Sequence, residues 1–461
     1  MRFAVALSLL LIGFFAKGQD STFIIHSVEI EGNKLTKNYI IEKEITFSKG
    51  DVISMTSFRE KAARSKQNLI NTSLFNFADI NDSIAGNLLF VKVKVKERWY
   101  TWPQPILTGE DRNTFDWLQY RTFDRFSYGL YLNQYNIGGR QQTMQLKLKF
   151  GYSQEIGVLY KIPYLVRTKN HGLNLSFLQV KRHEIYYKSL NDKIVYLKNS
   201  KQFMREELNA YLEYVFRFKL YQQHFFRVQF DNVQVADTII QNSENPYYLY
   251  KGQNKATYFS LKYLYRIDKR DSKNYPIKGH DIELEANKYG LVFTPAKINT
   301  AMFSVLAEKF GQISSKIYYA IGLKARVFTD NTIPFYIARG FGFNNDFVRG
   351  YEPYMISGTD FFIAKSNIKW QLYKPRVYKI KFLPFDKFNT FHHAIYLNLF
   401  TDAGYIKDRI YLNQNQLGNQ WLIGYGIGLD FVTYYDKVLR IEFSTNKKVQ
   451  SGIYVSFIAP I

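Results

Sequence analysis

The most regular feature of the chain is an alternation of apolar and polar residues over segments of about ten residues. Residues 211–220 show it best, with an apolar face and a charged face made respectively by Leu212, Tyr214, Phe216, Phe218 and Leu220 and by Glu213, Arg217 and Lys219. The same alternation recurs at 144–150, 259–268, 281–286 and 439–444. Soluble sandwiches also alternate, but their strands typically have about 5–6 residues. Long strands with charge along the whole polar face favour a membrane β-barrel.

Counting these segments after residue 102 predicts sixteen strands, which start near Pro103, Ser127, Gln142, Glu155, Asn170, Gln202, Tyr221, Lys255, Gly279, Lys297, Ser314, Asp360, Thr390, Trp421, Lys437 and Gly452. An even number of strands returns both ends of the barrel to one side of the membrane. We expect short turns at 274–276 and 435–436 on that side. The longer polar loops 182–201 and 241–254 are expected on the other.

The first hundred residues have a different pattern. Residues 23–30 read as a strand, 36–45 and 57–70 as helices, and 77–81 and 88–95 as strands. A small α+β domain is therefore predicted before the barrel.

The extreme N-terminus predicts a secretory signal peptide, residues 1–18. A basic Arg2 precedes an apolar run from Phe3 to Phe15, and small residues follow it. The mature chain is expected to start near Gln19. The sequence has no cysteine, which excludes disulfides and a cysteine-linked lipid anchor.

Composition agrees with a barrel. Aromatic residues make up 18 % of the chain, and the mean hydropathy of −0.28 indicates that apolar residues are evenly diluted by polar ones. After the signal peptide, no window approaches the roughly 20 apolar residues of a membrane helix, so only a barrel could span a membrane. The net charge is +23. Because the basic residues are spread along the strands, we expect anionic lipid headgroups or an acidic client chain as partners, and no nucleic acid.

One long segment interrupts the alternation. Residues 334–359 carry four glycines, two prolines and seven Phe or Tyr residues between two alternating segments. A loop of this length is usually functional or disordered, and this one is too aromatic for a disordered segment. We expect it to pack against another part of the protein.

The N-terminal domain resembles a POTRA domain. Its matching residues are Gly32-Asn33, Gly50-Asp51, Leu74-Phe75 and Val93 to Glu97. The resemblance implies a periplasmic domain over residues 19–98 that takes up an unfolded client or a periplasmic partner by adding a strand to an exposed sheet edge. The residues expected at that edge are Phe77, Asp79, Val91 and Val93. A domain that only orients or plugs the barrel is the alternative.

The remainder, residues 99–461, resembles the superfamily of BamA, TamA and the two-partner-secretion transporters. Its sixth outward loop carries a Val-Arg-Gly-Tyr motif at 348–351, and further matches lie at 268–279, 400–404 and 424–429. The resemblance implies a sixteen-stranded transmembrane β-barrel whose loop 329–359 folds inward. Its anchor is expected to consist of Val348, Arg349, Gly350, Tyr351, Phe400, Asp402 and Gly404. A planar guanidinium on Arg349 would bind the carboxylate of Asp402, because an unpaired cation in a narrow barrel costs free energy.

The closing strand is expected to be short, and the junction between the first and last barrel strands, here called the seam, is expected to be weak. Family barrels often finish on an aromatic residue, whereas this chain ends at Ile461. The residues expected at the seam are Gly452, Tyr454 and Phe457. The resemblance implies that client strands are added there.

Catalytic signatures are missing from the sequence. There is no nucleophile elbow, phosphate loop or zinc-spaced histidine pair. The adjacent His392 and His393 of a strand point to opposite faces. We therefore expect no enzyme, metal or cofactor. We expect an outer-membrane biogenesis factor that inserts or translocates client proteins, or lipid, at the outer membrane through capture by the POTRA domain and through the barrel seam. We expect one barrel per chain, in contact with outer-membrane lipid and lipopolysaccharide. A passive pore or an envelope anchor that docks a periplasmic partner is the alternative.

Overall fold

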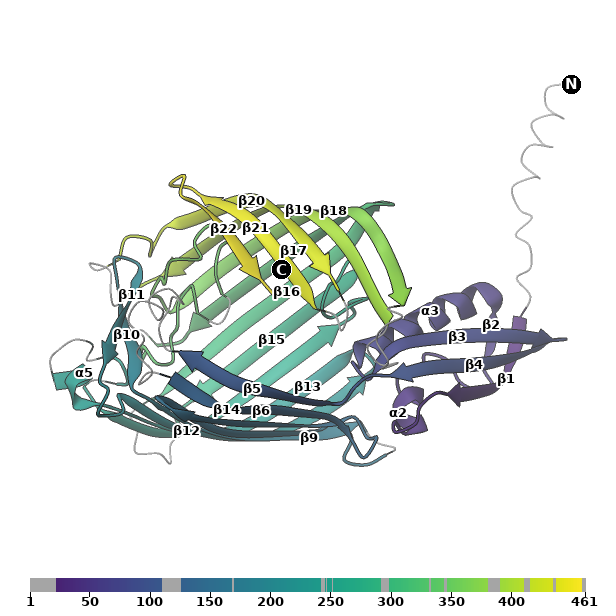
Figure 1. Cartoon of the computed structure of the whole chain (residues 1–461), viewed down its shortest axis with the longest axis horizontal. Coiled ribbons are helices and arrows are strands. Elements are labelled where there is room, and N and C mark those ends of the chain that lie inside the picture. Colours follow the sequence, from purple (N-terminus) through teal and green to yellow (C-terminus); the bar gives the residue numbers. More distant parts are fainter. Residues whose placement is uncertain are drawn as a thin grey trace, which may run out of the picture. The chain divides into compact units, whose positions relative to one another are not determined.

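A computed structural model describes residues 22–457 apart from 110–125, 168–169, 242–244, 246, 251, 292–297, 331–332, 344–345, 380–389, 410–414 and 434–436. The predicted signal peptide and the predicted turn at 435–436 lie outside the described residues. The chain divides into two compact units, Met1–Glu97 and Arg98–Ile461, and each is described by itself (Figure 1).

The N-terminal unit is a four-stranded sheet with two helices. Its elements are β1 (Thr22–Glu31), α2 (Asn38–Glu42), β2 (Val52–Ser54), α3 (Met55–Asn71), β3 (Phe75–Ala85) and β4 (Leu88–Glu97). The strand order is β2-β1-β4-β3. Helix α3 begins after Ser54, whose hydroxyl accepts a hydrogen bond from the backbone N–H of Ser57 (3.3 Å). The sequence predicted the helices and the three long strands but not the three-residue strand β2.

The predicted client edge of this sheet needs a correction. Strand β4 pairs with both β1 and β3, so it is a central strand. Val91 and Val93 on β4 are buried in the core and do not lie at an open edge. Phe77 and Asp79 lie on β3, which ends the sheet order. Alternation identifies the buried face of a strand, but it does not reveal which neighbours the strand has.

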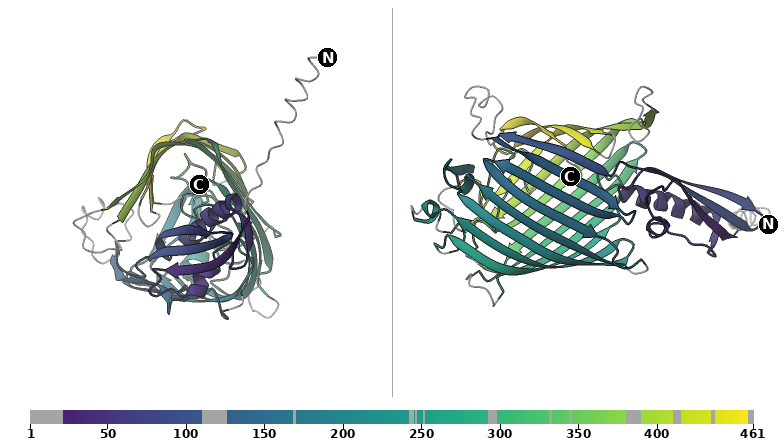
Figure 2. Two further views of the ribbon diagram at one scale, coloured as in Figure 1. Left: turned by 90° about the vertical axis from the view of Figure 1, so that its right-hand side faces the viewer. Right: turned by 60° about the horizontal axis from the view of Figure 1, so that its bottom comes forward.

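The second unit is an antiparallel sheet of sixteen strands rolled into a barrel (Figure 2). Its strands are β5 (Thr101–Gly109), β6 (Phe126–Ile137), β7 (Gln142–Gly151), β8 (Ser153–Ile162), β9 (His171–Arg182), β12 (Arg205–Lys219), β13 (Gln222–Val235), β14 (Lys255–Asp268), β15 (Gly279–Tyr289), β16 (Thr300–Ser314), β17 (Ile317–Phe328), β18 (Asp360–Lys379), β19 (Thr390–Lys407), β20 (Trp421–Val432), β21 (Val438–Asn446) and β22 (Ser451–Ser456). The predicted strand number is confirmed, and every predicted start lies within three residues of the observed one.

The barrel wall is apolar outside and charged inside. On β12 and β13, the apolar Leu212 and Val228 are exposed, whereas Glu213 pairs with Arg227 inside (2.7 Å). An uncovered apolar exterior is typical of a transmembrane barrel, because lipid takes the place of a packed partner.

No helix in the described ranges combines the length and the apolar character that crossing a membrane requires.

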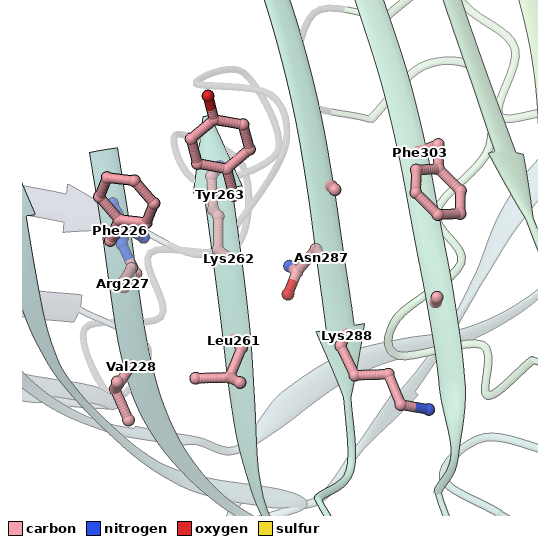
Figure 3. A pocket seen from close by; sticks show the side chains of 11 residues that line it. Phe226, Arg227, Val228, Leu261, Lys262, Tyr263, Asn287, Lys288 and Phe303 are labelled. Atoms are coloured by element: carbon pink, nitrogen blue, oxygen red, sulfur yellow. The ribbon is translucent and has the colours of Figure 1, made fainter. Parts of the chain in front are cut away.

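The side chains on the outer surface of β13–β16 leave a depression of about 360 Å³ (Figure 3). The small side chains of Ala286 and Ala301 leave room between the rings of Phe226, Tyr263 and Phe303. This part of the exterior is therefore indented.

The two ends of the barrel differ. At the turn end, adjacent strands are joined by short turns such as 220–221 and 315–316. At the loop end, the predicted polar loop 182–201 contains a hairpin, β10 (Glu184–Leu190) with β11 (Lys193–Lys198). The helix α5 (Asp237–Gln241) lies just before the predicted loop 241–254 and ends at its first residue. The hairpin turns at Asn191 and Asp192, which both have positive φ and belong to the residue types that favour two-residue turns. Alternation did not predict either element.

The sheet order ends at β5 on one side and at β22 on the other. Among the described residues, the two strands form no backbone pairs with each other. Strand β22 pairs with β21 only, from Arg440↔Ser456 to Thr445↔Ser451. The seam is therefore an unpaired junction in the described wall.

Candidate functional site: the inward loop

The loop between β17 and β18, residues 329–359, is packed inside the barrel and is here called the inward loop. Phe341 and Ile356 form two backbone hydrogen bonds with each other (2.9 and 3.0 Å), which fold the loop back on itself. Its apolar side chains join three buried clusters, one of which includes the hairpin β10–β11, while the other two include residues of the wall at β18–β20 and at β16–β17. The loop is thus held by burial as well as by polar contacts.

The inward loop is anchored to the wall by an ion pair between Arg349 and Asp402 of β19. The guanidinium donates from Nε to Oδ2 (2.8 Å) and from Nη2 to Oδ1 (2.6 Å), and the backbone N–H of Arg349 also donates to Oδ2 (3.2 Å). Both side chains are almost fully buried, with 3 % and 0 % of their surface exposed. A two-pronged contact of this kind fixes orientation as well as distance.

Three further wall residues complete the environment of Arg349. Nη1 donates to Glu442 (3.1 Å) on β21, and Nη2 donates to Asn367 (2.7 Å) on β18. The guanidinium also lies 3.8 Å from the ring centroid of Phe400. The sequence analysis did not include Glu442 and Asn367. Their lumen-facing alternation was visible, but their proximity to Arg349 depends on strand register.

Glycines let the inward loop approach the wall closely. Gly350 has a φ of +90°, and a Cβ there would lie 2.8 Å from the carbonyl oxygen of Thr445. A Cβ on Gly404 would lie 2.5 Å from the side chain of Val348. The two glycines predicted for the anchor thus occupy positions where a side chain would separate loop and wall.

The backbone groups of Gly350 and the side chains of the two residues after it also have fixed contacts. The carbonyl of Gly350 accepts from Asn446 Nδ2 (3.0 Å), and its N–H donates to the carboxylate of Glu352 (2.7 Å). Tyr351 is buried in the cluster that includes Leu422. Burial raises the pKa of the Glu352 carboxyl, Glu442 raises it further, and Arg349 lowers it.

The hairpin β10–β11 holds the inward loop from the loop end of the barrel. The carboxylate of Asp192 accepts from the backbone N–H groups of Gln416 (3.0 Å) and Leu417 (3.1 Å). The carbonyl of Asp192 accepts from the N–H of Met355 (2.9 Å). One hairpin residue therefore connects the inward loop to the loop between β19 and β20.

The predicted seam residues lie on or next to the last strand. Gly452 and Tyr454 are in β22, where a Cβ on Gly452 would lie 2.5 Å from the hydroxyl of Tyr454. Phe457 follows the strand and is 72 % exposed. In the register of β21 and β22, Tyr454 lies opposite Glu442 and Gly452 lies opposite Ser444. Two of the three predicted seam residues therefore adjoin the anchor of the inward loop, whereas Phe457 lies beyond the end of the strand.

The chemistry of the anchor is electrostatic and steric. No group of three or more potential metal ligands occurs within the described ranges. The buried ion pair and its neighbours hold a loop in place, and they offer no arrangement of nucleophile and base.

Comparisons with known proteins agree with this architecture. Residues 23–98 match the family described as "POTRA: Surface antigen variable number repeat". No curated protein sequence matches the chain significantly.

Among solved structures, BamA from Haemophilus ducreyi lacking POTRA domains 1–3 is similar, with a TM-score of 0.50 and 14 % identity over 94 % of this chain and 83 % of that one. CdiB from Escherichia coli has a TM-score of 0.49 and 9 % identity over 96 % of this chain and 91 % of that one. CdiB from Acinetobacter baumannii has a TM-score of 0.46 and 10 % identity over 94 % and 74 %. The chain thus has a BamA/TamA-like architecture, a POTRA domain followed by a sixteen-stranded transmembrane barrel.

Proposed function

We propose that this protein is an outer-membrane biogenesis factor that inserts or translocates client proteins, with its POTRA domain in the periplasm. The observation that supports this most strongly is the seam. Backbone N–H and C=O groups that face hydrocarbon without partners cost several kcal/mol each. The edges of β5 and β22 would therefore gain free energy by pairing with a client strand.

The POTRA domain supplies a second sheet edge, on the periplasmic side. Strand β3 pairs with β4 alone in the described sheet, and Phe77 and Asp79 lie along it. An unfolded client or a periplasmic partner segment would add there as a fifth strand. Photo-crosslinking from position 79 in cells would identify that segment, with position 91 on the central strand as the matched control. Equal crosslinking from both positions would contradict strand addition at β3.

The occupied lumen argues against a passive pore. The inward loop, through Phe335 and Phe343, forms a buried cluster inside the wall together with the hairpin β10–β11. Wide water-filled porins instead leave their lumen open. The apolar exterior, including the depression at Ala286 and Ala301, would contact outer-membrane lipid and lipopolysaccharide.

Closing the seam tests the proposal directly, since the chain has no cysteine of its own. Cysteines at Leu107 on β5 and Ile453 on β22 would be joined by a bifunctional, reducible thiol reagent in cells that depend on this variant. We expect outer-membrane client assembly to stop and to recover after reduction. The matched control joins Leu212 and Val228, which already face each other on paired strands. Persistent client assembly and ion conductance with a closed seam would instead indicate a passive pore or an anchoring barrel.

A further inference from the structure

The turn between β14 and β15, residues 269–278, folds into the barrel at the turn end. Tyr275 at its tip is 6 % exposed and packs in a cluster with residues of β17, β19 and β21. Its ring centroid lies 4.9 Å from that of Tyr396 on β19. The turn therefore reaches past its neighbouring strands to the far side of the lumen.

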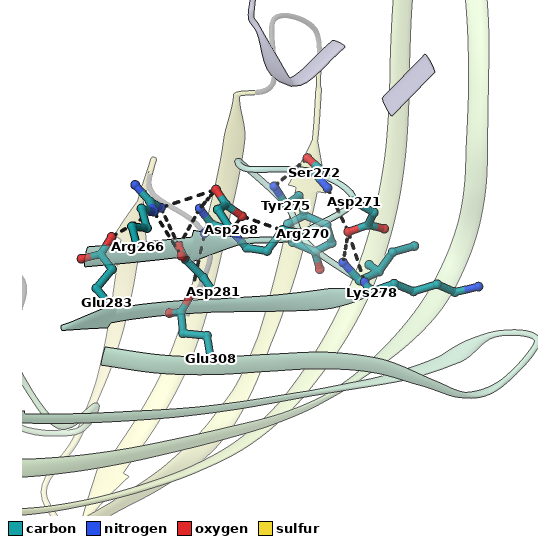
Figure 4. A network of polar contacts seen from close by, with 11 residues as sticks. Arg266, Asp268, Arg270, Asp271, Ser272, Tyr275, Lys278, Asp281, Glu283 and Glu308 are labelled. Carbon is teal, nitrogen blue, oxygen red and sulfur yellow. Dashed lines mark hydrogen bonds and ion pairs between the residues drawn. The ribbon is translucent and has the colours of Figure 1, made fainter. Parts of the chain in front are cut away.

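The base of this turn is held rigidly by charged groups (Figure 4). Arg270 binds Asp268 (2.9 Å) and Asp281 (2.9 Å), and Arg266 also binds Asp281 (2.5 Å). The carboxylate of Asp271 accepts from three backbone N–H groups of the turn, at 2.9, 3.0 and 3.1 Å. A turn with so many internal contacts holds its tip at a fixed height in the lumen.

The tip makes a hydrogen bond across the barrel. The hydroxyl of Tyr275 donates to Asp430 Oδ2 (2.8 Å) on β20. Asp430 is in turn bound through both oxygens by Arg440 on β21 (2.8 and 3.1 Å). Asp430 and Arg440 are 0 % and 4 % exposed, so this contact lies in a site shielded from water.

The Asp430–Arg440 pair lies next to the anchor of the inward loop. Glu442 is two residues beyond Arg440 on β21, and its carboxylate lies 3.9 Å from Arg440 Nε and 3.1 Å from Arg349 Nη1. Glu442 is therefore shared by two arginines. One of them is oriented by the turn through Asp430, and the other belongs to the inward loop.

We propose that Tyr275 is a positioning residue for the inward loop. By holding Asp430, its hydroxyl keeps Arg440 directed at that carboxylate and leaves Glu442 to Arg349. Without the hydroxyl, the buried Asp430 loses a donor and Arg440 can turn toward Glu442, where it competes with Arg349. A change at the turn end of the barrel is thereby transmitted to the loop end through three residues on two adjacent strands.

Hydrogen–deuterium exchange on the full chain in lipid nanodiscs tests this coupling. Tyr275→Phe removes the hydroxyl and keeps the ring. We expect exchange in peptides covering 346–359 to accelerate at least about threefold, while the barrel strands retain their protection. Tyr318→Phe is the matched control, because it makes the same chemical change in the same aromatic cluster but not at Asp430. It should leave the loop peptides unchanged.

Faster exchange in the turn peptides 269–278 with unchanged loop peptides would overturn the proposal, as would no change in either. A uniform loss of protection in all strands would show a merely structural role and would also overturn it. If Tyr275→Phe does not fold, Asp430→Asn is measured instead, and the same selective acceleration is expected. In the Arg349→Ala background, Tyr275→Phe should add nothing further, since coupled residues are non-additive. These readouts need no client, so they remain interpretable if the proposed biogenesis function fails.

Discussion

The carbonyl oxygen of Arg349 lies against the α-carbon of Gly424, so closely that a Cβ at this glycine would stand only 1.7 Å from it. Gly424 is on β20, opposite Asp402 of β19 in the strand register. The backbone of the inward loop thus rests on a bare stretch of wall directly beside the carboxylate that binds its arginine.

Replacing Gly424 with alanine should displace the inward loop, because the methyl group would collide with the backbone carbonyl oxygen of Arg349. A backbone atom cannot move aside as the end of a flexible side chain can. We expect the segment 346–359 to become susceptible to added protease. The barrel should remain folded, which is seen as a difference in gel migration between unheated and heated samples. Gly157→Ala is the control, since there the new Cβ meets the tip of the Leu178 side chain. Equal protease resistance in both variants would contradict this contact.

Replacing Arg349 with alanine should release the loop more completely than replacing it with lysine. Removing one partner of a buried ion pair typically costs about 3–5 kcal/mol, because the other charge remains buried. Lysine keeps the charge but cannot bind Asp402 with two prongs. We therefore expect client assembly and loop protection to decrease in the order wild type, Arg349→Lys, Arg349→Ala, with the barrel folded throughout. Arg376→Ala, at an exposed arginine of β18, should behave as wild type.

Asp192 should tolerate asparagine better than alanine. Its φ of +59° suits Asp and Asn but strains alanine, and only a polar side chain can accept from Gln416 and Leu417. We expect Asp192→Ala to raise the exchange rates of both the hairpin 184–198 and the segment 415–418, and Asp192→Asn to raise them less. Increased exchange in the hairpin alone would show that Asp192 does not connect the two segments.

Docking of the inward loop should weaken as pH rises through the titration of Glu352. The pKa of this carboxyl is raised in the docked state above its ordinary 4.5, so the docked loop favours the protonated form. Its contribution is complete below pH 4.5 and is lost between 4.5 and the raised pKa. A spin label on a cysteine at the exposed Pro353 should therefore become more mobile over this range. With Glu352→Gln the label should remain immobile across it, and an unchanged pH profile in that variant would assign the titration to another group.

The sequence predicted the barrel wall well, because every strand has the same local requirement of an apolar outside and a polar inside. The strand starts near Lys255, Gly279 and Trp421 could be located for this reason alone. Contacts between distant strands were harder to predict. The motif indicated Arg349 and Asp402, but Glu442 and the hydrogen bond from Tyr275 to Asp430 depend on how the sheet rolls up.

The errors have physical causes of the same kind. Val91 and Val93 have the alternation of any half-buried strand, and only the pairing of β4 with two neighbours shows that they are central. The sequence predicted a polar loop where the hairpin β10–β11 lies. The hairpin was missed because it is held by contacts with Met355 and Leu417, which are distant in sequence.

Strand β22 shares only six residue pairs with β21, whereas β18 and β19 share seventeen. The number of backbone hydrogen bonds that must break to detach a strand therefore falls sharply at the C-terminal end of the wall. Thermal or mechanical stress on the barrel would therefore detach this strand first. The four strands before it would remain paired, because ion pairs and hydrogen bonds inside the lumen connect them.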